Sequence, residues 1–145
     1  MTSIYVGTYT EPPAGAGPGV LLFDFDDASG VLALRSVFDA GPNPSFLALD
    51  ADRRRLYAVN ELDDGAVSAF ERDLSTGELR FINRQPSHGG APCFAGFDAS
   101  GRHLLVANYG GGTAAAFPID DEGGLTPASV VLDHRQGPRR RRIRT

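Results

Sequence analysis

A segment of the chain occurs twice, 48 residues apart, and this repeat limits the possible folds more than any other feature. Residues 44–60 read PSFLALDADRRRLYAVN, and residues 92–108 read PCFAGFDASGRHLLVAN. Proline, phenylalanine, aspartate and asparagine recur at the same places in both copies. A period of this length is typical of repeat proteins, in which each repeat is one supersecondary unit that packs against its neighbours.

The repeat continues through the connections and also occurs earlier in the chain. GAVSAF at 65–70 aligns with GTAAAF at 112–117, and STGEL at 75–79 aligns with EGGL at 122–125. IYVGTYT at 4–10 and GVLLFDFDDASGVL at 19–32 form an incomplete earlier copy. The offset changes only at the connections, because loops tolerate insertions better than strands do.

Each repeat contains short apolar segments of β-favouring residues, bounded by turns rich in Gly, Asp and Ser, which is the pattern of strands joined in hairpins. Four short strands in a repeat of roughly 40–50 residues are typical of a propeller blade. We therefore expect an all-β fold of about three four-stranded blades. The expected strands are 3–9, 19–25 and 31–38 in the first unit, 45–49, 55–60, 66–71 and 78–83 in the second, and 93–97, 103–108, 113–118 and 125–131 in the third.

The residues that form the repeat also resemble a known family. VGTYT, NPSFLALD, LYAVNE, TGEL, QPSHGGAPC and LLVANYGGG occur in the order and spacing of the lactonase family of seven-bladed propellers, typified by 6-phosphogluconolactonase. The resemblance implies hydrolysis of a sugar lactone, a small-molecule substrate, in the setting of the pentose phosphate pathway. It implies no metal and no organic cofactor. Two alternatives stay open, a lactonising cycloisomerase of carboxymuconates and a propeller that binds a partner without catalysis.

The resemblance predicts a propeller fragment over 1–134, with units at 3–41, 44–88 and 92–132, followed by an Arg-rich tail at 135–145. Seven such units would need roughly 340 residues. We expect the tail to be an aberrant or flexible terminus, with an anion-binding patch as the alternative. Because an incomplete ring has open strand edges, we expect the short chain to self-associate and to be inactive alone.

Charge and composition exclude several classes of partner. The formal net charge is −4, and residues 1–138 contain nine arginines against all 18 carboxylates, which argues against a nucleic-acid partner. A single cysteine, Cys93, excludes an internal disulfide. Neither a signal-peptide pattern nor an apolar run of membrane-helix length is present, so we expect a cytoplasmic protein without a membrane partner.

Glu61 is the best candidate for a catalytic acid or base. Lactone hydrolysis needs a base that activates water and donor groups that stabilise the developing oxyanion. Glu61 follows the strand at 55–60, on the rim where we expect the connections around residues 7–9, 41–44, 60–61, 88–92 and 108–109 to gather. A turn cap or a solvated side chain is the alternative role.

Five further residues are candidates for substrate binding at this rim. Asn60 and Asn108 recur at one blade position, where an asparagine either binds a ligand or bonds its own loop. Tyr109 precedes three glycines and either stacks on a sugar or packs between blades. His88 and His134 fall at corresponding blade ends and either shuttle protons or lie in exposed loops.

Three other features are expected to be structural. Asp24, Asp26 and Asp27 lack the spacing of a calcium loop and are expected to lie on a solvated strand edge. Cys93 begins an inner strand, and we expect it to be buried as a small apolar side chain. His103 is expected in a hairpin turn on the opposite rim.

Overall fold

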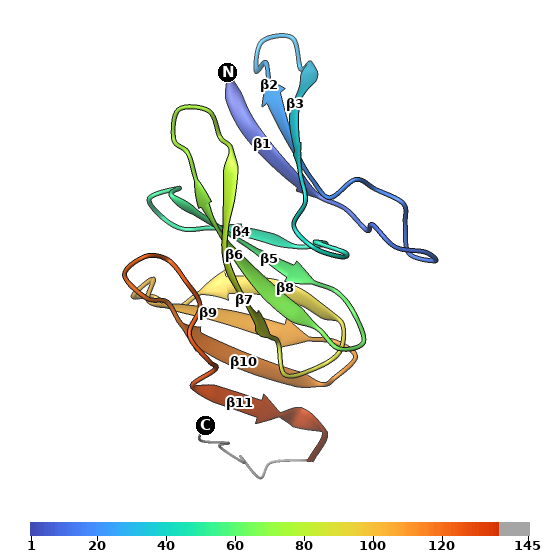
Figure 1. Cartoon of the computed structure of the whole chain (residues 1–145), viewed down its shortest axis with the longest axis vertical. Helices are drawn as coiled ribbons and strands as arrows, with labels where there is room; N and C mark the ends of the chain where they lie inside the picture. Colours follow the sequence, from blue (N-terminus) through green and yellow to red (C-terminus); the bar gives the residue numbers. More distant parts are fainter. Residues whose placement is uncertain (137–145) are drawn as a thin grey trace.

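The chain folds into three antiparallel sheets, and the computed structural model describes residues 1–136. Figure 1 shows the sheets one after another along the long axis of the molecule, from β1–β3 to β8–β11. The first sheet, blade 1, has the order β1-β2-β3, the second, blade 2, β4-β5-β6-β7, and the third, blade 3, β8-β9-β10-β11. The expected all-β fold of propeller blades is confirmed.

The strands lie close to the expected segments. Blade 1 consists of β1 (Thr2–Gly7), β2 (Val20–Phe25) and β3 (Leu32–Phe38); blade 2 of β4 (Leu47–Leu49), β5 (Arg55–Asn60), β6 (Ala66–Arg72) and β7 (Leu79–Pro86); blade 3 of β8 (Pro92–Phe97), β9 (His103–Asn108), β10 (Thr113–Pro118) and β11 (Val130–Asp133). A single 3-10 turn, η1 (His134–Gln136), follows β11. Most residues of the predicted tail lie outside the described part of the chain.

The outer strand of blade 3 does not lie where the repeat predicts it. We expected 125–131, whereas β11 begins at Val130 and Leu125 forms only an isolated bridge with Ile119. Pro127 lies in the predicted strand and has no backbone N–H to donate to the neighbouring strand. Pairing therefore begins only beyond this proline, where Val130 lies opposite Ala116.

The aspartate that recurs in the repeat stabilises the first hairpin of blade 2 and of blade 3. Asp50 Oδ1 accepts hydrogen bonds from the backbone N–H groups of Arg54 and Arg55. Asp98 Oδ1 does the same for Arg102 and His103. A carboxylate that accepts nearby backbone N–H groups in this way favours a tight turn, so both copies carry aspartate.

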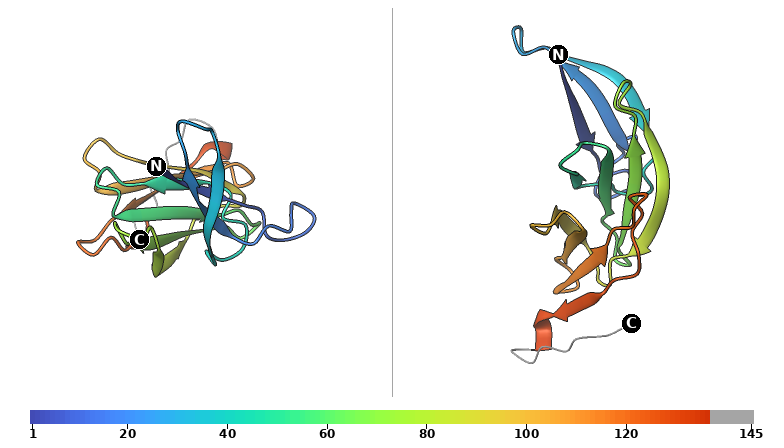
Figure 2. Two further views of the ribbon diagram at one scale, coloured as in Figure 1. Left: turned by 90° about the horizontal axis from the view of Figure 1, so that it is seen from above. Right: turned by 90° about the vertical axis from the view of Figure 1, so that its left-hand side faces the viewer.

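Two apolar cores lie between the blades, and they differ in size. The core between blades 2 and 3 contains 12 buried residues, including Tyr57, Val67 and Phe117. The core between blades 1 and 2 contains five, Val20, Ala40, Leu56, Ala58 and Phe70. Since burial of apolar surface is the main favourable contribution to stability, blade 1 is held less strongly than blade 3. In Figure 2 the three sheets succeed one another in a curved row.

A repeated tyrosine also connects successive blades. The hydroxyl of Tyr5 in β1 donates to the carbonyl of Gly77, in the outer hairpin of blade 2. The hydroxyl of Tyr57 in β5 donates to the carbonyl of Gly123 in blade 3 over 2.9 Å. Leu105 takes this place in β9 and is 41% exposed, so the described residues leave that face of blade 3 uncovered.

Candidate functional site

The connections expected to form one rim lie together on one side of the sheets, on the right in Figure 1. The connections after β1 and β5 meet the connection from β3 to β4, and the connection from β7 to β8 meets those after β5 and β9. The bonds that join them include Glu61 N–H to Asn43 O at 3.0 Å, Ala91 N–H to Leu62 O at 2.7 Å and Tyr109 N–H to Ala91 O at 2.9 Å.

Glu61 lies at the boundary between blades 1 and 2, where two hydroxyl groups hold one oxygen of its carboxylate. Oε2 accepts a hydrogen bond from the Tyr9 hydroxyl at 2.9 Å and another from Ser45 Oγ. Tyr9 comes from the connection after β1, and Ser45 precedes β4 in blade 2. Within residues 1–136, Oε1 accepts no hydrogen bond, so one carboxylate oxygen is left for a substrate or a water molecule.

The contact with Glu61 changes the acidity of Tyr9. The hydrogen bond to the Glu61 carboxylate raises the pKa of the Tyr9 phenol, and burial adds to this increase. A phenol with a raised pKa keeps its proton through the neutral range. Tyr9 is therefore a hydrogen-bond donor to Glu61 at physiological pH.

Asn60 and Asn108 were expected to bind a ligand or to bond their own loop, and the structure shows that both bond to a different connection. Asn60 Nδ2 donates to the carbonyls of Ala40 and Pro42 at 2.8 and 2.9 Å, and Asn60 Oδ1 accepts from Ser68. Asn108 Nδ2 donates to the Ser87 carbonyl at 2.8 Å. Both side chains are buried and bond to the connection that enters their blade.

The remaining candidates do not gather at Glu61. Tyr109 is 85% exposed. The His88 side chain is exposed, and its ring stacks on Phe117 with 6.3 Å between centroids. His134 lies exposed in η1, and its backbone N–H bonds to Gly112 at 2.9 Å. None of these three side chains hydrogen-bonds to Glu61 in the described part of the chain.

Two expectations about single residues have different outcomes. Cys93 was expected to be buried, but it is exposed at the start of β8. His103 lies in β9 beside the hairpin turn, as expected, and its Nδ1 is 3.2 Å from Asp98 Oδ2.

The three aspartates near the end of β2 have ordinary partners. Asp24 pairs with Arg35, and Asp26 accepts hydrogen bonds from Ala28 and Ser29 in the following turn. Across residues 1–136, no three His, Cys, Asp or Glu side chains converge as metal ligands would. The same residues contain no helix long and apolar enough to cross a membrane.

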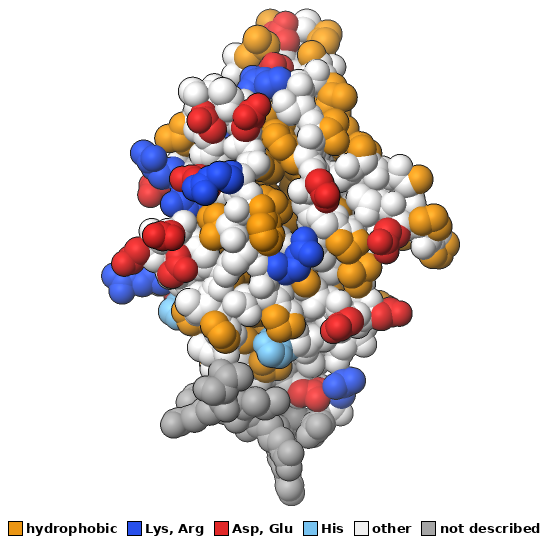
Figure 3. All heavy atoms as spheres, in the orientation of Figure 1, with side chains coloured by type: hydrophobic (Ala, Val, Ile, Leu, Met, Phe, Trp, Pro, Cys, Tyr) orange, Lys and Arg blue, Asp and Glu red, His pale blue; other side chains and the backbone are white. Residues whose placement is uncertain are grey.

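The rim is acidic. Its five connections (8–19, 39–46, 61–65, 87–91 and 109–112) contain Glu11, Asp39, Glu61, Asp63 and Asp64 and no Lys or Arg. Acidic side chains are visible along the right-hand side of Figure 3, and a basic side chain appears there only near the C-terminal end. The connections themselves therefore offer carboxylates and hydroxyls, while Arg84 and Arg135 reach the rim from β7 and η1 and are bonded to Ser68 and Asp133.

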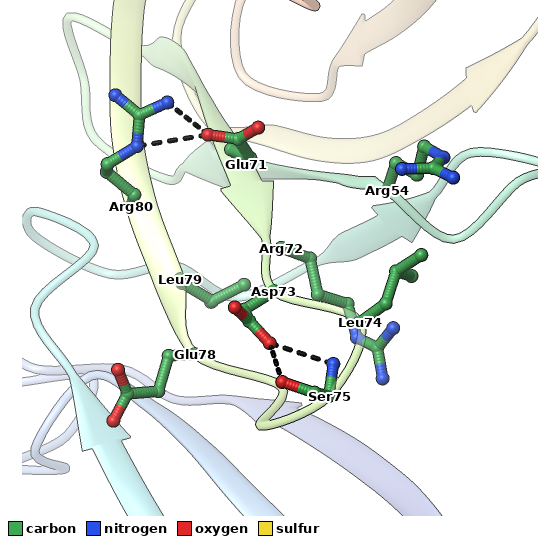
Figure 4. Close-up of a pocket in the computed structure, with 9 residues that line it drawn as sticks. All are labelled: Arg54, Glu71, Arg72, Asp73, Leu74, Ser75, Glu78, Leu79 and Arg80. Atoms are coloured by element: carbon green, nitrogen blue, oxygen red, sulfur yellow. Dashed lines mark hydrogen bonds and ion pairs between the residues drawn. The ribbon is translucent and has the colours of Figure 1, made fainter.

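The opposite rim contains a wider hollow of about 780 Å³, shown in Figure 4. Most of its charged side chains have partners, since Arg80 pairs with Glu71, Asp73 accepts hydrogen bonds from Ser75 and Arg72 donates to Tyr5. The side chains of Arg54 and Glu78 have none among the described residues. Glu71 and Asp73 are therefore already engaged by neighbouring side chains. We therefore place the candidate site at the rim with Glu61.

Sequence reasoning did not identify the two partners of Glu61 or the residue that joins its loop to blade 1. Tyr9 aligns with Glu61 and Tyr109 in the repeat, so repeat position was a signal for it. Ser45 aligns with Cys93 in the same way. Asn43 carried only a weak signal, an asparagine between two prolines in a connection.

Comparison with known proteins gives a consistent result. The family described as Lactonase, 7-bladed beta-propeller matches residues 3–144. A 6-phosphogluconolactonase of Bacillus subtilis is 32% identical over 139 residues, which cover 94% of this chain and 39% of that protein. One of Formosa agariphila is 35% identical over 123 residues, 83% of this chain and 34% of that protein.

A solved structure agrees. The periplasmic gluconolactonase of Pseudomonas aeruginosa superimposes with a TM-score of 0.81 at 30% identity, over 91% of this chain and 38% of that one. The chain thus spans less than two fifths of the length of the relatives described.

Proposed function

We infer the function from the family: the chain belongs to the lactonase family of seven-bladed β-propellers. We propose that it takes part in the hydrolytic opening of a sugar lactone, with 6-phosphogluconolactone as the first substrate to test. The names of the two curated relatives support this substrate. The observation on which the proposal rests is the carboxylate of Glu61 at the rim, with one oxygen held by two hydroxyls and the other available.

In the proposed reaction Glu61 is the general base. Water attacks the lactone carbonyl while Glu61 takes a proton from this water, which gives a tetrahedral intermediate. The ring C–O bond then breaks, and protonated Glu61 gives the proton to the leaving ring oxygen, so that the hydroxy acid forms and the Glu61 carboxylate is restored. Tyr9 and Ser45 hold Oε2, which fixes the direction in which Oε1 faces the attacking water. A positioned base of this kind contributes roughly 10²–10⁴-fold to a rate.

Groups for the oxyanion and for a phosphate belong, in this proposal, to parts of the propeller beyond the described residues. The five connections of this rim contain five carboxylates and no Lys or Arg. The two arginines that reach the rim, Arg84 and Arg135, are already bonded to Ser68 and Asp133, and oxyanion stabilisation needs donors or cations. We therefore propose that this chain alone is at most a slow catalyst, in line with the expectation that it is inactive alone, and binding is the more sensitive measurement.

The experiment measures acid release and binding together. The rate of acid release from glucono-δ-lactone and from 6-phosphogluconolactone is measured and corrected for spontaneous hydrolysis. Gluconate binding is measured by tyrosine fluorescence. Glu61→Gln is expected to abolish the catalysed part. Asp64→Asn, on the same connection but exposed, is the matched control and is expected to keep it. If the chain neither binds gluconate nor accelerates lactone opening, the proposal is wrong; binding without acid release would favour the non-catalytic alternative.

We further propose that copies of this chain self-associate through the open face of blade 3. Phe46 of blade 2 packs against Phe94, with ring centroids 5.2 Å apart, whereas Phe94 is itself 49% exposed beside Leu105. Exposed apolar side chains clustered on a blade face favour association. Light scattering is expected to show oligomers that Leu105→Arg disperses, while Leu34→Arg, on the outer strand and 55% exposed, leaves them unchanged. A monomeric wild-type chain at high concentration would contradict this.

A further inference from the structure

Asn43, in the connection between blades 1 and 2, bonds to Thr10 and Glu11, the two residues that follow Tyr9. Its Oδ1 accepts the backbone N–H groups of Thr10 and Glu11 at 2.8 and 3.0 Å. Its own backbone N–H donates to Thr10 Oγ1 at 2.9 Å. These three bonds fix the backbone directly after Tyr9 to a residue of the neighbouring connection.

The same asparagine bonds to both the backbone N–H and the backbone carbonyl of Glu61. The Glu61 N–H donates to the Asn43 carbonyl at 3.0 Å, and Asn43 Nδ2 donates to the Glu61 carbonyl at 3.2 Å. Asn43 is only 7% exposed. A single buried residue therefore holds the two segments that carry Tyr9 and Glu61.

Backbone conformation alone does not explain why this residue is asparagine. Asn43 has φ +46°, in the left-handed region that asparagine tolerates better than most residues. However, Ala91 takes the equivalent place before blade 3 with φ +50°. Its carbonyl accepts the N–H of Tyr109 at 2.9 Å, just as the Asn43 carbonyl accepts that of Glu61.

The comparison separates two roles. Ala91 shows that the connection forms with a methyl side chain and with backbone bonds only. The Asn43 amide adds the bonds to Thr10, Glu11 and the Glu61 carbonyl, and all of these bonds serve the boundary where Tyr9 meets Glu61.

We propose that Asn43 is a positioning residue that keeps Glu61 and Tyr9 in hydrogen-bonding register across the boundary between blades 1 and 2. The inference rests on the proposed role of Glu61, and it adds the residue that sets the geometry of that carboxylate. Tyr9 and Glu61 belong to different blades, so their contact depends on how the two connections are held.

The first test uses Asn43→Ala, which reproduces the side chain found at position 91. The alkaline titration of Tyr9 is followed by tyrosinate absorbance, and Tyr9→Phe identifies its part of the curve. The hydrogen bond to Glu61 raises the Tyr9 pKa, so loss of register is expected to make Tyr9 ionise at lower pH than in the wild type. Arg53→Ala is the matched control, because Arg53 also has a left-handed φ, +57°, but lies in a hairpin on the opposite rim.

An unchanged Tyr9 titration in a folded Asn43→Ala chain would overturn the proposal. Asn43→Gly is the second variant, since glycine adopts a positive φ without strain. If neither variant folds, the proposal is also overturned, because Asn43 would then be required for the fold and not for the site.

A second readout separates this inference from the function itself. Where lactone opening is measurable, Asn43→Ala is expected to lower kcat about tenfold to a hundredfold with little change in KM, the scale expected when a catalytic group is misplaced. Added to Glu61→Gln, it should cause no further loss. A shift in the Tyr9 titration in a wild-type chain that neither binds gluconate nor opens the lactone would keep the positioning role and refute the proposed function.

Discussion

Asn60 and Asn108 occupy the same blade position, but only Asn60 has a hydrogen-bond partner for its side-chain oxygen among the described residues. This difference predicts the effects of substituting Ser68 and Ala115. Asn60 Oδ1 accepts from Ser68 Oγ at 2.7 Å. Asn108 Oδ1 is buried and has no partner within residues 1–136. The repeat places Ala115 where blade 2 has Ser68. We therefore predict that Ser68→Ala destabilises the chain and that Ala115→Ser stabilises it.

The structure gives the size of each effect. Ser68→Ala removes two hydrogen bonds, to Asn60 and from Arg84 Nε at 2.8 Å, and leaves a buried oxygen unpaired. An unsatisfied buried group costs about 1–3 kcal/mol, so we expect a loss of about 2 kcal/mol. Ala115→Ser supplies the donor that Asn108 lacks, and a typical net hydrogen bond contributes about 1 kcal/mol.

Urea unfolding measures both changes. The chain has four tyrosines and no tryptophan, so tyrosine fluorescence and far-UV circular dichroism report unfolding. With a slope of about 2 kcal/mol per M, Ser68→Ala should lower the midpoint by about 1 M and Ala115→Ser should raise it by about 0.5 M. Dilute samples at two concentrations check that self-association does not contribute.

Ala114→Ser is the matched control, because Ala114 is the neighbouring strand residue and its side chain lies on the other face of β10. Ala114→Ser is expected to leave the urea midpoint unchanged. The reasoning is refuted if Ala115→Ser does not raise the midpoint, or if Ala114→Ser raises it equally, since the unpaired oxygen of Asn108 would then not be the cause.

Three further outcomes are expected. Tyr57→Phe removes the bond to the Gly123 carbonyl and should lower the free energy of unfolding by about 1 kcal/mol, measured by urea unfolding; an unchanged midpoint would exclude this bond as a blade contact. Asp73 has its pKa lowered to about 2, first by the Ser75 hydroxyl, so its stabilisation is complete above about pH 4 and is lost as pH falls towards 2. The urea midpoints of wild type and Asp73→Asn should therefore converge as pH falls from 5 to 2, and a constant difference would contradict this. Cys93 is exposed and should react with a thiol reagent in the folded chain, at a rate that denaturant scarcely changes; protection until unfolding would contradict its placement.

The sequence predicts those parts of the fold whose causes are local and repeated. Asp50 and Asp98 recur because each accepts backbone N–H groups within its own hairpin. Asn60 and Asn108 recur because each bonds to the connection that enters its blade. Such interactions leave the same residue at the same place in both complete copies, so ten of the eleven strands could be placed from the repeat.

The predictions that were wrong or missing depend on features that do not recur in the repeat. A proline interrupts pairing between Leu125 and Val130, which shifts one outer strand. The exposure of Cys93 depends on what lies against its blade. Asn43 acts through contacts with two other connections, 18 and about 33 residues away, and no periodic pattern marks such contacts. The unit boundaries and the cytoplasmic location stay predictions, and most of the Arg-rich tail lies outside the described residues.

The unequal size of the two apolar cores has a consequence for the site. Proteins open in cooperative parts whose free energies differ, and the part with the least buried apolar surface opens first. Here that part is β1–β3, held by five buried core residues where the other boundary has 12. Tyr9 belongs to this part and Glu61 does not. The pairing at the rim should therefore be lost by partial opening, visible as early hydrogen exchange or proteolysis in residues 2–38, while blades 2 and 3 are still folded.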